Sequence, residues 1–174
     1  PLQHADSVLS GKDIDIFFSG TMENRPDRQM FLDKISKRFS ESYKVQLNLP
    51  RVAGTDFRTV SHSKADYLQY VANSKILLNP RDGKDIWQAE KGRLFEGQLV
   101  NTLVVSEHPS DRAHSHANLV TYADDQDQLC TVIDYYLKNA DALRKITTRR
   151  KELTENQFST VHLFYSFLKK YLLS

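Results

Sequence analysis

Arg93 and Glu96 form the strongest chemical signal in the sequence, because these two opposite charges lie three positions apart. If residues 90–100 are helical, this spacing places both side chains on one face of the helix. A carboxylate there can accept hydrogen bonds from the two vicinal hydroxyls of a ribose, and a guanidinium can pair with a diphosphate. The alternative is an ordinary exposed ion pair between the two residues, and the spacing alone leaves both interpretations open.

A second candidate site is a turn of small residues, Ser19-Gly20-Thr21, which follows an apolar run and leads toward a predicted helix. Such a turn exposes backbone N–H groups at the positive end of the helix dipole, where a phosphate can bind. Arg25 and Arg28 lie in the same segment and could add charge-assisted hydrogen bonds. A plain turn with solvated arginines is the alternative interpretation.

Several familiar site patterns are absent from these positions. The dinucleotide-binding fingerprint is missing because only one glycine follows the first apolar run, and residues 48–50 lack the expected acidic residue. A phosphoacceptor receiver domain would need an acidic pair in place of Ser19-Gly20 and an aspartate in place of Asn79. No Walker A lysine motif, nucleophile elbow or paired-cysteine metal site occurs. The sequence therefore argues against a nicotinamide or flavin dehydrogenase and against a receiver domain.

Histidines and the single cysteine give weaker signals. His108, His114 and His116 cluster near Asp111, which makes a metal site conceivable, but a solvated polar loop explains that spacing better. Cys130 lies beside the apolar stripe of a predicted helix, and we expect a buried, unreactive thiol. Neither group is given a role in the predicted site.

The composition is that of an ordinary globular protein. The chain has 174 residues, 40% hydrophobic and 26% charged, which suits one domain with a sizeable core. A net charge of +2 argues against a dedicated nucleic-acid or membrane-surface binder. No apolar stretch approaches the roughly 18 residues of a membrane span. The chain begins with proline and has no signal-like segment, so we expect a cytoplasmic protein, present as an excised domain or a fragment.

Strands and helices must alternate to position the candidate residues. Short apolar runs predict strands at 14–18, 43–49, 75–80, 102–106 and 118–122. Apolar residues at helical spacing predict helices at 28–39, 64–74, 90–100, 126–139, 141–157 and 160–173, the second of them capped by Ser63.

This alternation predicts an α/β fold, with a linker or incoming arm at residues 1–12 and a single Rossmann-like domain at residues 13–174. We expect a parallel sheet of about five strands, covered by helices on both faces, and a helical C-terminus. Ligands of such folds bind beyond the carboxyl ends of the strands. The residues that follow the first, third and fourth strands are therefore the candidates for a ligand site.

Five segments, taken in order, match a known pattern: Phe18-Ser19-Gly20-Thr21 with Arg25; Tyr67 to Tyr70 followed by Ser74-Lys75-Ile76-Leu77-Leu78-Asn79; Arg93-Leu94-Phe95-Glu96; Val104-Val105-Ser106-Glu107; and Tyr122-Ala123-Asp124. Together they resemble the C-terminal half of a GT-B-type glycosyltransferase. The closest branch is the group-1-like one that includes the spore-maturation-protein-like glycosyltransferases. The resemblance extends from about Asp13 to the C-terminus. Where that family has glycine before the fourth strand, this chain has Asn101, which tolerates a left-handed backbone better than most residues.

The resemblance implies a nucleotide-diphosphate sugar as the donor substrate. Glu96 would bind its ribose, while Arg93 and the first turn would lie near its diphosphate. A metal or another cofactor is not expected, because positive side chains and a helix dipole can stabilise the leaving diphosphate. The acceptor, and usually the catalytic base, would come from an N-terminal half that these residues do not include, so no catalytic base is named. The implied donor-binding residues are Ser19, Gly20, Thr21, Arg25, Asn79, Arg93 and Glu96.

A non-catalytic Rossmann-like module that binds a protein partner through its C-terminal helices is the alternative function. The helix at 160–173 has more aromatic and leucine surface than one face of a sheet requires. We therefore expect part of it to pack against the missing half or another subunit. Nucleotide binding that depends on Glu96 would distinguish the two functions.

Overall fold

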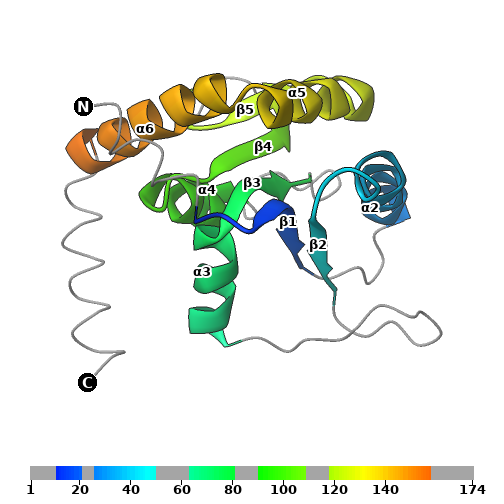
Figure 1. Ribbon diagram of the computed structural model, residues 1–174. Coiled ribbons are helices and arrows are strands. Elements are labelled where there is room, and N and C mark those ends of the chain that lie inside the picture. The colour runs from blue at the N-terminus through cyan, green and yellow to red at the C-terminus, as the bar shows by residue number, and fades with distance from the viewer. Residues whose placement is uncertain (1–10, 21–25, 50–62, 81–89, 109–117, 158–174) are drawn as a thin grey trace.

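The computed structural model describes residues 11–20, 26–49, 63–80, 90–108 and 118–157 (Figure 1). Within these ranges the strands form one parallel sheet in the order β2-β1-β3-β4-β5. The predicted single Rossmann-like α/β domain is confirmed. The elements are β1 (Ile14–Ser19), α2 (Pro26–Phe39), β2 (Val45–Asn48), α3 (Lys64–Ala72), β3 (Ser74–Asn79), α4 (Glu90–Leu99), β4 (Leu103–Glu107), β5 (Thr121–Ala123), α5 (Gln126–Lys138) and α6 (Ala140–Gln157).

Helices cover both faces of the sheet, as predicted. Successive strand residues point to opposite faces, so Ile16 lies in a cluster with α2 and α5, whereas Phe17 lies in a cluster with α3 and α4. In Figure 1, α2 lies on one side of the strands and α3 and α4 lie on the other. The last helix among the described residues, α6, contacts both layers, because Leu143 belongs to the first cluster and Leu153 packs against the second.

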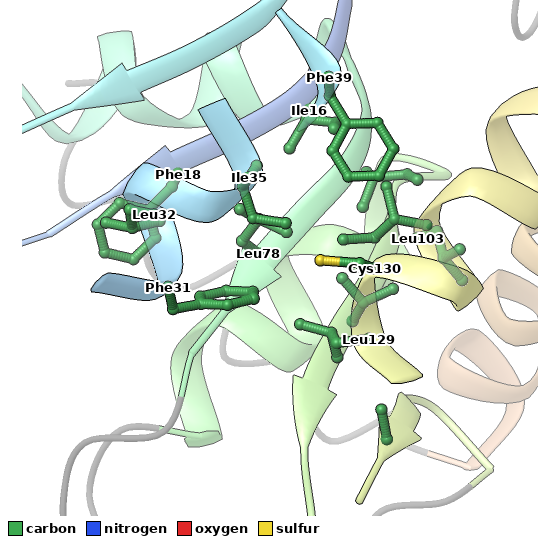
Figure 2. Close-up of a cluster of buried hydrophobic side chains, with 14 of the residues drawn as sticks. Ile16, Phe18, Phe31, Leu32, Ile35, Phe39, Leu78, Leu103, Leu129 and Cys130 are labelled. Atoms are coloured by element: carbon green, nitrogen blue, oxygen red, sulfur yellow. The ribbon is translucent and has the colours of Figure 1, made fainter. Parts of the chain in front are cut away.

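The apolar stripe predicted on α2 faces the sheet. Phe31, Ile35 and Phe39 are buried, at the spacing of one face of a helix. Cys130 of α5 lies in the same cluster and is fully buried (Figure 2). Burial raises the pKa of its thiol, which keeps the sulfur protonated and unreactive. The expectation of a buried cysteine is therefore confirmed.

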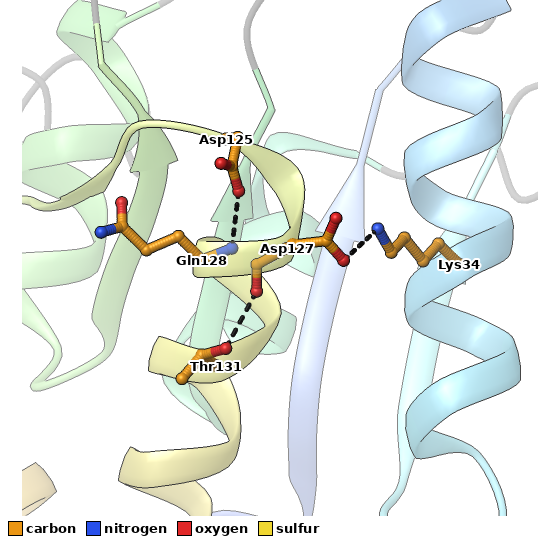
Figure 3. Close-up of polar contacts among 5 residues, drawn as sticks. All are labelled: Lys34, Asp125, Asp127, Gln128 and Thr131. Atoms are coloured by element: carbon orange, nitrogen blue, oxygen red, sulfur yellow. Dashed lines mark hydrogen bonds and ion pairs between the residues drawn. The ribbon is translucent and has the colours of Figure 1, made fainter.

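Polar contacts join α2 and α5 at the surface above this cluster (Figure 3). The Asp125 carboxylate caps α5 by accepting a hydrogen bond from the Gln128 N–H at 2.7 Å. The Lys34 ammonium donates to Asp127 at 2.6 Å, but the Asp127 side chain is 82% exposed. An exposed pair contributes little. The apolar cluster therefore holds these helices together more than the ion pair does.

The fifth strand begins later than predicted. We expected a strand at 118–122, whereas β5 starts at Thr121. Leu119 and Val120 are buried in the cluster under α4, and the side-chain amide of Gln98 donates a hydrogen bond to the Leu119 carbonyl. This carbonyl is bound by a helix side chain, so pairing with β4 begins only at Val105 and Thr121.

The turn between α4 and β4 has the geometry of a Schellman motif. The Thr102 N–H donates to the Gly97 carbonyl at 2.9 Å, and the Asn101 N–H donates to the Gln98 carbonyl at 3.2 Å. Asn101 has a φ of 55°, the left-handed conformation in which glycine is usual. Asparagine thus substitutes for glycine here, and the departure from the family pattern leaves the turn intact.

Lys12, at the end of the expected N-terminal arm, is anchored in the domain and only 8% exposed. Its ammonium donates to the carbonyls of Ala72 at 2.7 Å, Ser74 at 2.9 Å and Val100 at 3.0 Å, and to the Thr102 hydroxyl at 2.9 Å. Ala72 ends α3 and Val100 follows α4, so the negative ends of two helix dipoles meet at this cation. Burial lowers the pKa of Lys12 to about 8.

Two sequence-based expectations lie partly or wholly outside the described ranges. The helix predicted at 160–173 belongs to residues that the structure does not describe, and so do residues 1–10 of the expected arm. In the described part of the chain, no helix combines the length and apolar character needed to cross a membrane.

Candidate functional site

The strand order places the candidate site between β1 and β3. In the sheet, β2 lies on one side of β1, whereas β3 and β4 lie on the other side. The direction of the chain connections therefore reverses between β1 and β3, which makes a topological switch point at their carboxyl ends. Open α/β sheets bind ligands in the crevice at such a point. Ser19 ends β1 and Asn79 ends β3, so both predicted residues lie at this edge.

Two arginines from opposite faces of the sheet meet at the end of β1. The Arg93 guanidinium of α4 donates to the Ser19 carbonyl at 2.5 Å and lies 5.2 Å from the centre of the Phe18 ring. The Arg28 guanidinium of α2 lies 5.8 Å from the same ring. Both distances are within the range of a cation–π contact. Two guanidinium groups therefore lie near the switch point.

Gly20 is required by the close approach of Arg93. A Cβ atom built on Gly20 would lie 2.9 Å from an Arg93 guanidinium nitrogen and 2.9 Å from the Phe18 ring. The Gly20 N–H donates to the Asn48 carbonyl at 3.2 Å, which continues the pairing of β1 with β2 beyond the strand end. A larger residue would push the guanidinium away from the end of β1. The small-residue turn found in the sequence thus makes room for Arg93.

Glu96 of α4 is held by two side chains of α3. The Tyr67 hydroxyl donates to Glu96 Oε2 at 2.9 Å, and the Lys64 ammonium donates to Oε1. The Glu96 side chain is only 17% exposed. Burial raises the pKa of the Tyr67 hydroxyl far above its usual value, and the Glu96 charge adds to this rise while Arg93 opposes it.

Arg93 and Glu96 lie on one helix face and both act on Tyr67, but their other contacts differ. Arg93 bonds to the end of β1, and Glu96 bonds to α3, so the exposed ion pair considered from the sequence is not what the described contacts show. Tyr67 lies close enough to both residues for both charges to act on its pKa. Arg93 and Glu96 therefore belong to one polar cluster with Tyr67 and Lys64.

Asn79 lies in the sheet edge beside this cluster and is 2% exposed. The Ser106 hydroxyl donates to the Asn79 carbonyl at 2.7 Å, and the Asn79 amide donates to the Ser106 hydroxyl oxygen at 3.4 Å. Asn79 Oδ1 is buried without a hydrogen-bond partner among the described residues. Buried acceptors are rarely left unpaired, so this oxygen is a candidate for a ligand donor group.

The remaining predicted residues are mostly outside the described ranges. Thr21 and Arg25 fall in residues 21–25, and His114, His116 and Asp111 fall in residues 109–117. His108 is described: its ring stacks on Tyr122 with centroids 5.0 Å apart, and its Nε2 lies 3.8 Å from Asp124 Oδ1. Among the residues that can be described, no group of three or more His, Cys, Asp or Glu side chains could hold a metal ion.

Lys64 and Tyr67 are the site residues that sequence reasoning missed. Both lie in the first turns of α3, whose start was predicted from the Ser63 cap, confirmed here as a capping box with Asp66. A helix that starts at the carboxyl edge of a sheet presents its first turn to the ligand edge, so their position was a usable signal. No signal in the sequence indicated their partner on α4, because Glu96 lies 32 positions from Lys64 and 29 positions from Tyr67.

Comparison with known proteins gives a match to a family. No curated protein matches the chain. Residues 28–169, which include most of α2, the polar cluster and every described strand except β1, match the family model described as glycosyl transferase-like. The chain therefore belongs to the glycosyl transferase-like family.

Proposed function

We propose that the chain is the donor-binding half of a GT-B-type glycosyltransferase of the group-1-like, spore-maturation-protein-like branch. It holds a nucleotide-diphosphate sugar at the carboxyl edge between β1 and β3. The observation that supports this most directly is the convergence of Arg93 and Arg28 on the end of β1, with Glu96 held one helical turn from Arg93. Guanidinium cations suit the charge of a diphosphate, and a carboxylate can accept hydrogen bonds from the two hydroxyls of a ribose.

In this proposal the chain stabilises the leaving group of the transfer reaction. The bond between the anomeric carbon and the diphosphate oxygen breaks, and its electron pair stays with the diphosphate. The Arg93 guanidinium stabilises the charge that grows there, and the nearby Arg28 adds a favourable field. The Asn79 side chain offers its buried oxygen to a donor group of the same ligand. The acceptor hydroxyl, and the base that takes its proton, come from a separate domain.

Changing Glu96 to glutamine tests the ribose contact. A hydrogen bond to a charged group contributes about 1.5–3 kcal/mol, so we expect nucleoside diphosphate affinity to fall about tenfold or more. The measurement is titration calorimetry with adenosine, guanosine, cytidine and uridine diphosphates. Glu155→Gln is the matched control, because Glu155 lies 53% exposed on α6 and pairs only with Lys151 in the described contacts. Unchanged affinity in Glu96→Gln would remove Glu96 from the site.

Changing Arg93 to alanine tests the diphosphate contact. The guanidinium is expected to act on phosphate charge, so affinity for a nucleoside diphosphate should fall about tenfold or more. Affinity for the bare nucleoside should change little. Equal losses for both ligands would contradict a role at the diphosphate. Because Arg93 also bonds to Ser19, the melting temperature without ligand is measured alongside.

Binding data also separate this proposal from the alternative function. If none of the four nucleoside diphosphates binds the folded chain, the non-catalytic interaction module becomes the better explanation. A thermal-shift screen with the same ligands is sensitive enough, because ligand at about 100 times its Kd adds roughly 2.7 kcal/mol of stability.

A further inference from the structure

We propose that Tyr67 is a positioning residue that orients Glu96 for the ribose hydroxyls, with Lys64 in a secondary role. The inference rests on the proposed function, because it concerns how the same site recognises a ribose. The contacts on the Glu96 carboxylate distinguish Tyr67 from an ordinary core tyrosine.

The carboxylate of Glu96 is half occupied by α3. Oε2 accepts from the Tyr67 hydroxyl and Oε1 accepts from the Lys64 ammonium. An ionised carboxylate has about four acceptor positions, two on each oxygen. In the described contacts one position on each oxygen therefore stays available, and two vicinal hydroxyls are a ligand group that fills two such positions. The protein bonds to Glu96 fix the direction in which the free positions point.

Tyr67 is itself held in place by two contacts of its ring. The ring lies 6.2 Å from the Phe17 ring, in the core between α3 and the sheet, and the Lys64 ammonium lies 4.8 Å from its centre. A hydroxyl fixed in this way can hold a carboxylate in one orientation without further loss of side-chain freedom. Tyr67 also remains a donor, because its raised pKa keeps the hydroxyl protonated.

Lys64 contributes less to this orientation than Tyr67. Its side chain is 64% exposed, so water screens its pair with Glu96 and competes for the ammonium. The ammonium also lies over the Tyr67 ring, at a distance that suits a cation–π contact. This contact helps to hold the ring in place and does not itself orient the carboxylate. Removal of the Tyr67 hydroxyl should therefore have the larger effect on ligand binding.

The test compares a ribonucleotide with the same nucleotide lacking both ribose hydroxyls. Among adenosine, guanosine, cytidine and uridine diphosphates, the tightest binder of the unmodified chain is compared with its 2′,3′-dideoxy form by titration calorimetry. The unmodified chain should prefer the ribose form about tenfold or more. Tyr67→Phe should reduce this preference to about threefold or less, with affinity for the dideoxy form unchanged within about twofold.

Tyr70→Phe is the matched control, because Tyr70 lies on the same helix and stacks on the same Phe17 ring at 5.6 Å. It should keep the full preference for ribose. If Tyr67→Phe keeps the preference, or weakens both ligands equally, Tyr67 is structural and the positioning role is overturned. If the unmodified chain shows no preference, or binds no nucleotide, the ribose role of Glu96 fails, and the positioning role fails with it. The two failures are therefore distinguishable.

Discussion

Replacing Lys12 with methionine should lower the free energy of unfolding by about 3 kcal/mol. The ammonium donates to three backbone carbonyls and one hydroxyl, all within 3.0 Å. The ammonium has three N–H donors to share among these four acceptors. Lys12→Met leaves the buried acceptors without this donor, and each buried polar group left unsatisfied costs about 1–3 kcal/mol.

Urea unfolding monitored by circular dichroism measures this loss. Lys138→Met is the control, because Lys138 is 62% exposed and pairs only with Asp134, four residues earlier on α5, in the described contacts. It should change stability by less than about 0.5 kcal/mol. A Lys12→Met protein as stable as the unmodified chain would show that the two helix ends do not depend on this cation.

The pH dependence of stability provides a second measurement on Lys12. Between about pH 8 and pH 10.5 the native state releases a proton that the unfolded state keeps. Stability contributed by this group therefore rises with pH across that window. Below about pH 8 both states hold the proton, and Lys12 adds no pH dependence. Lys12→Met should remove the rise, so equal slopes in both proteins would contradict the lowered pKa.

Replacing Gly97 with alanine should destabilise the domain by about 2 kcal/mol. A Cβ atom at this position would lie 2.4 Å from Val104 Cγ2 and 3.2 Å from the Thr102 carbonyl oxygen. Val104 is fully buried on a central strand, so it cannot move aside without disturbing its neighbours. The helix propensity gained by alanine, about 1 kcal/mol, offsets only part of this strain.

Gly11→Ala is the matched control for Gly97→Ala. A Cβ atom at Gly11 would meet nothing within 4 Å, and Gly11 is exposed. We therefore expect no loss, because substituting glycine at an unstrained position chiefly reduces the entropy of the unfolded chain. Thermal unfolding of both variants measures the difference. A Gly97→Ala protein that matches Gly11→Ala in melting temperature would show that α4 can shift away from the sheet.

Local patterns in the sequence predicted the described elements of this fold, apart from the start of β5. The buried stripe of Phe31, Ile35 and Phe39, the Ser63 cap and the left-handed turn at Asn101 all depend on residues within a few positions of one another. Such features follow from side-chain spacing and backbone sterics. The β5 boundary was wrong because a distant side chain, Gln98, bonds to the Leu119 carbonyl.

The sequence by itself determined the described strands and helices, apart from the start of β5, and the sheet edge at which Ser19 and Asn79 lie. Only the tertiary structure decided which side chains contact one another. The partners of Glu96 lie 29 and 32 positions away, and those of Lys12 lie 60 to 90 positions away. Such contacts depend on strand order and on which face each helix covers. The spacing of residues within one element carries no information about either, because the sheet is assembled from segments distant in the chain.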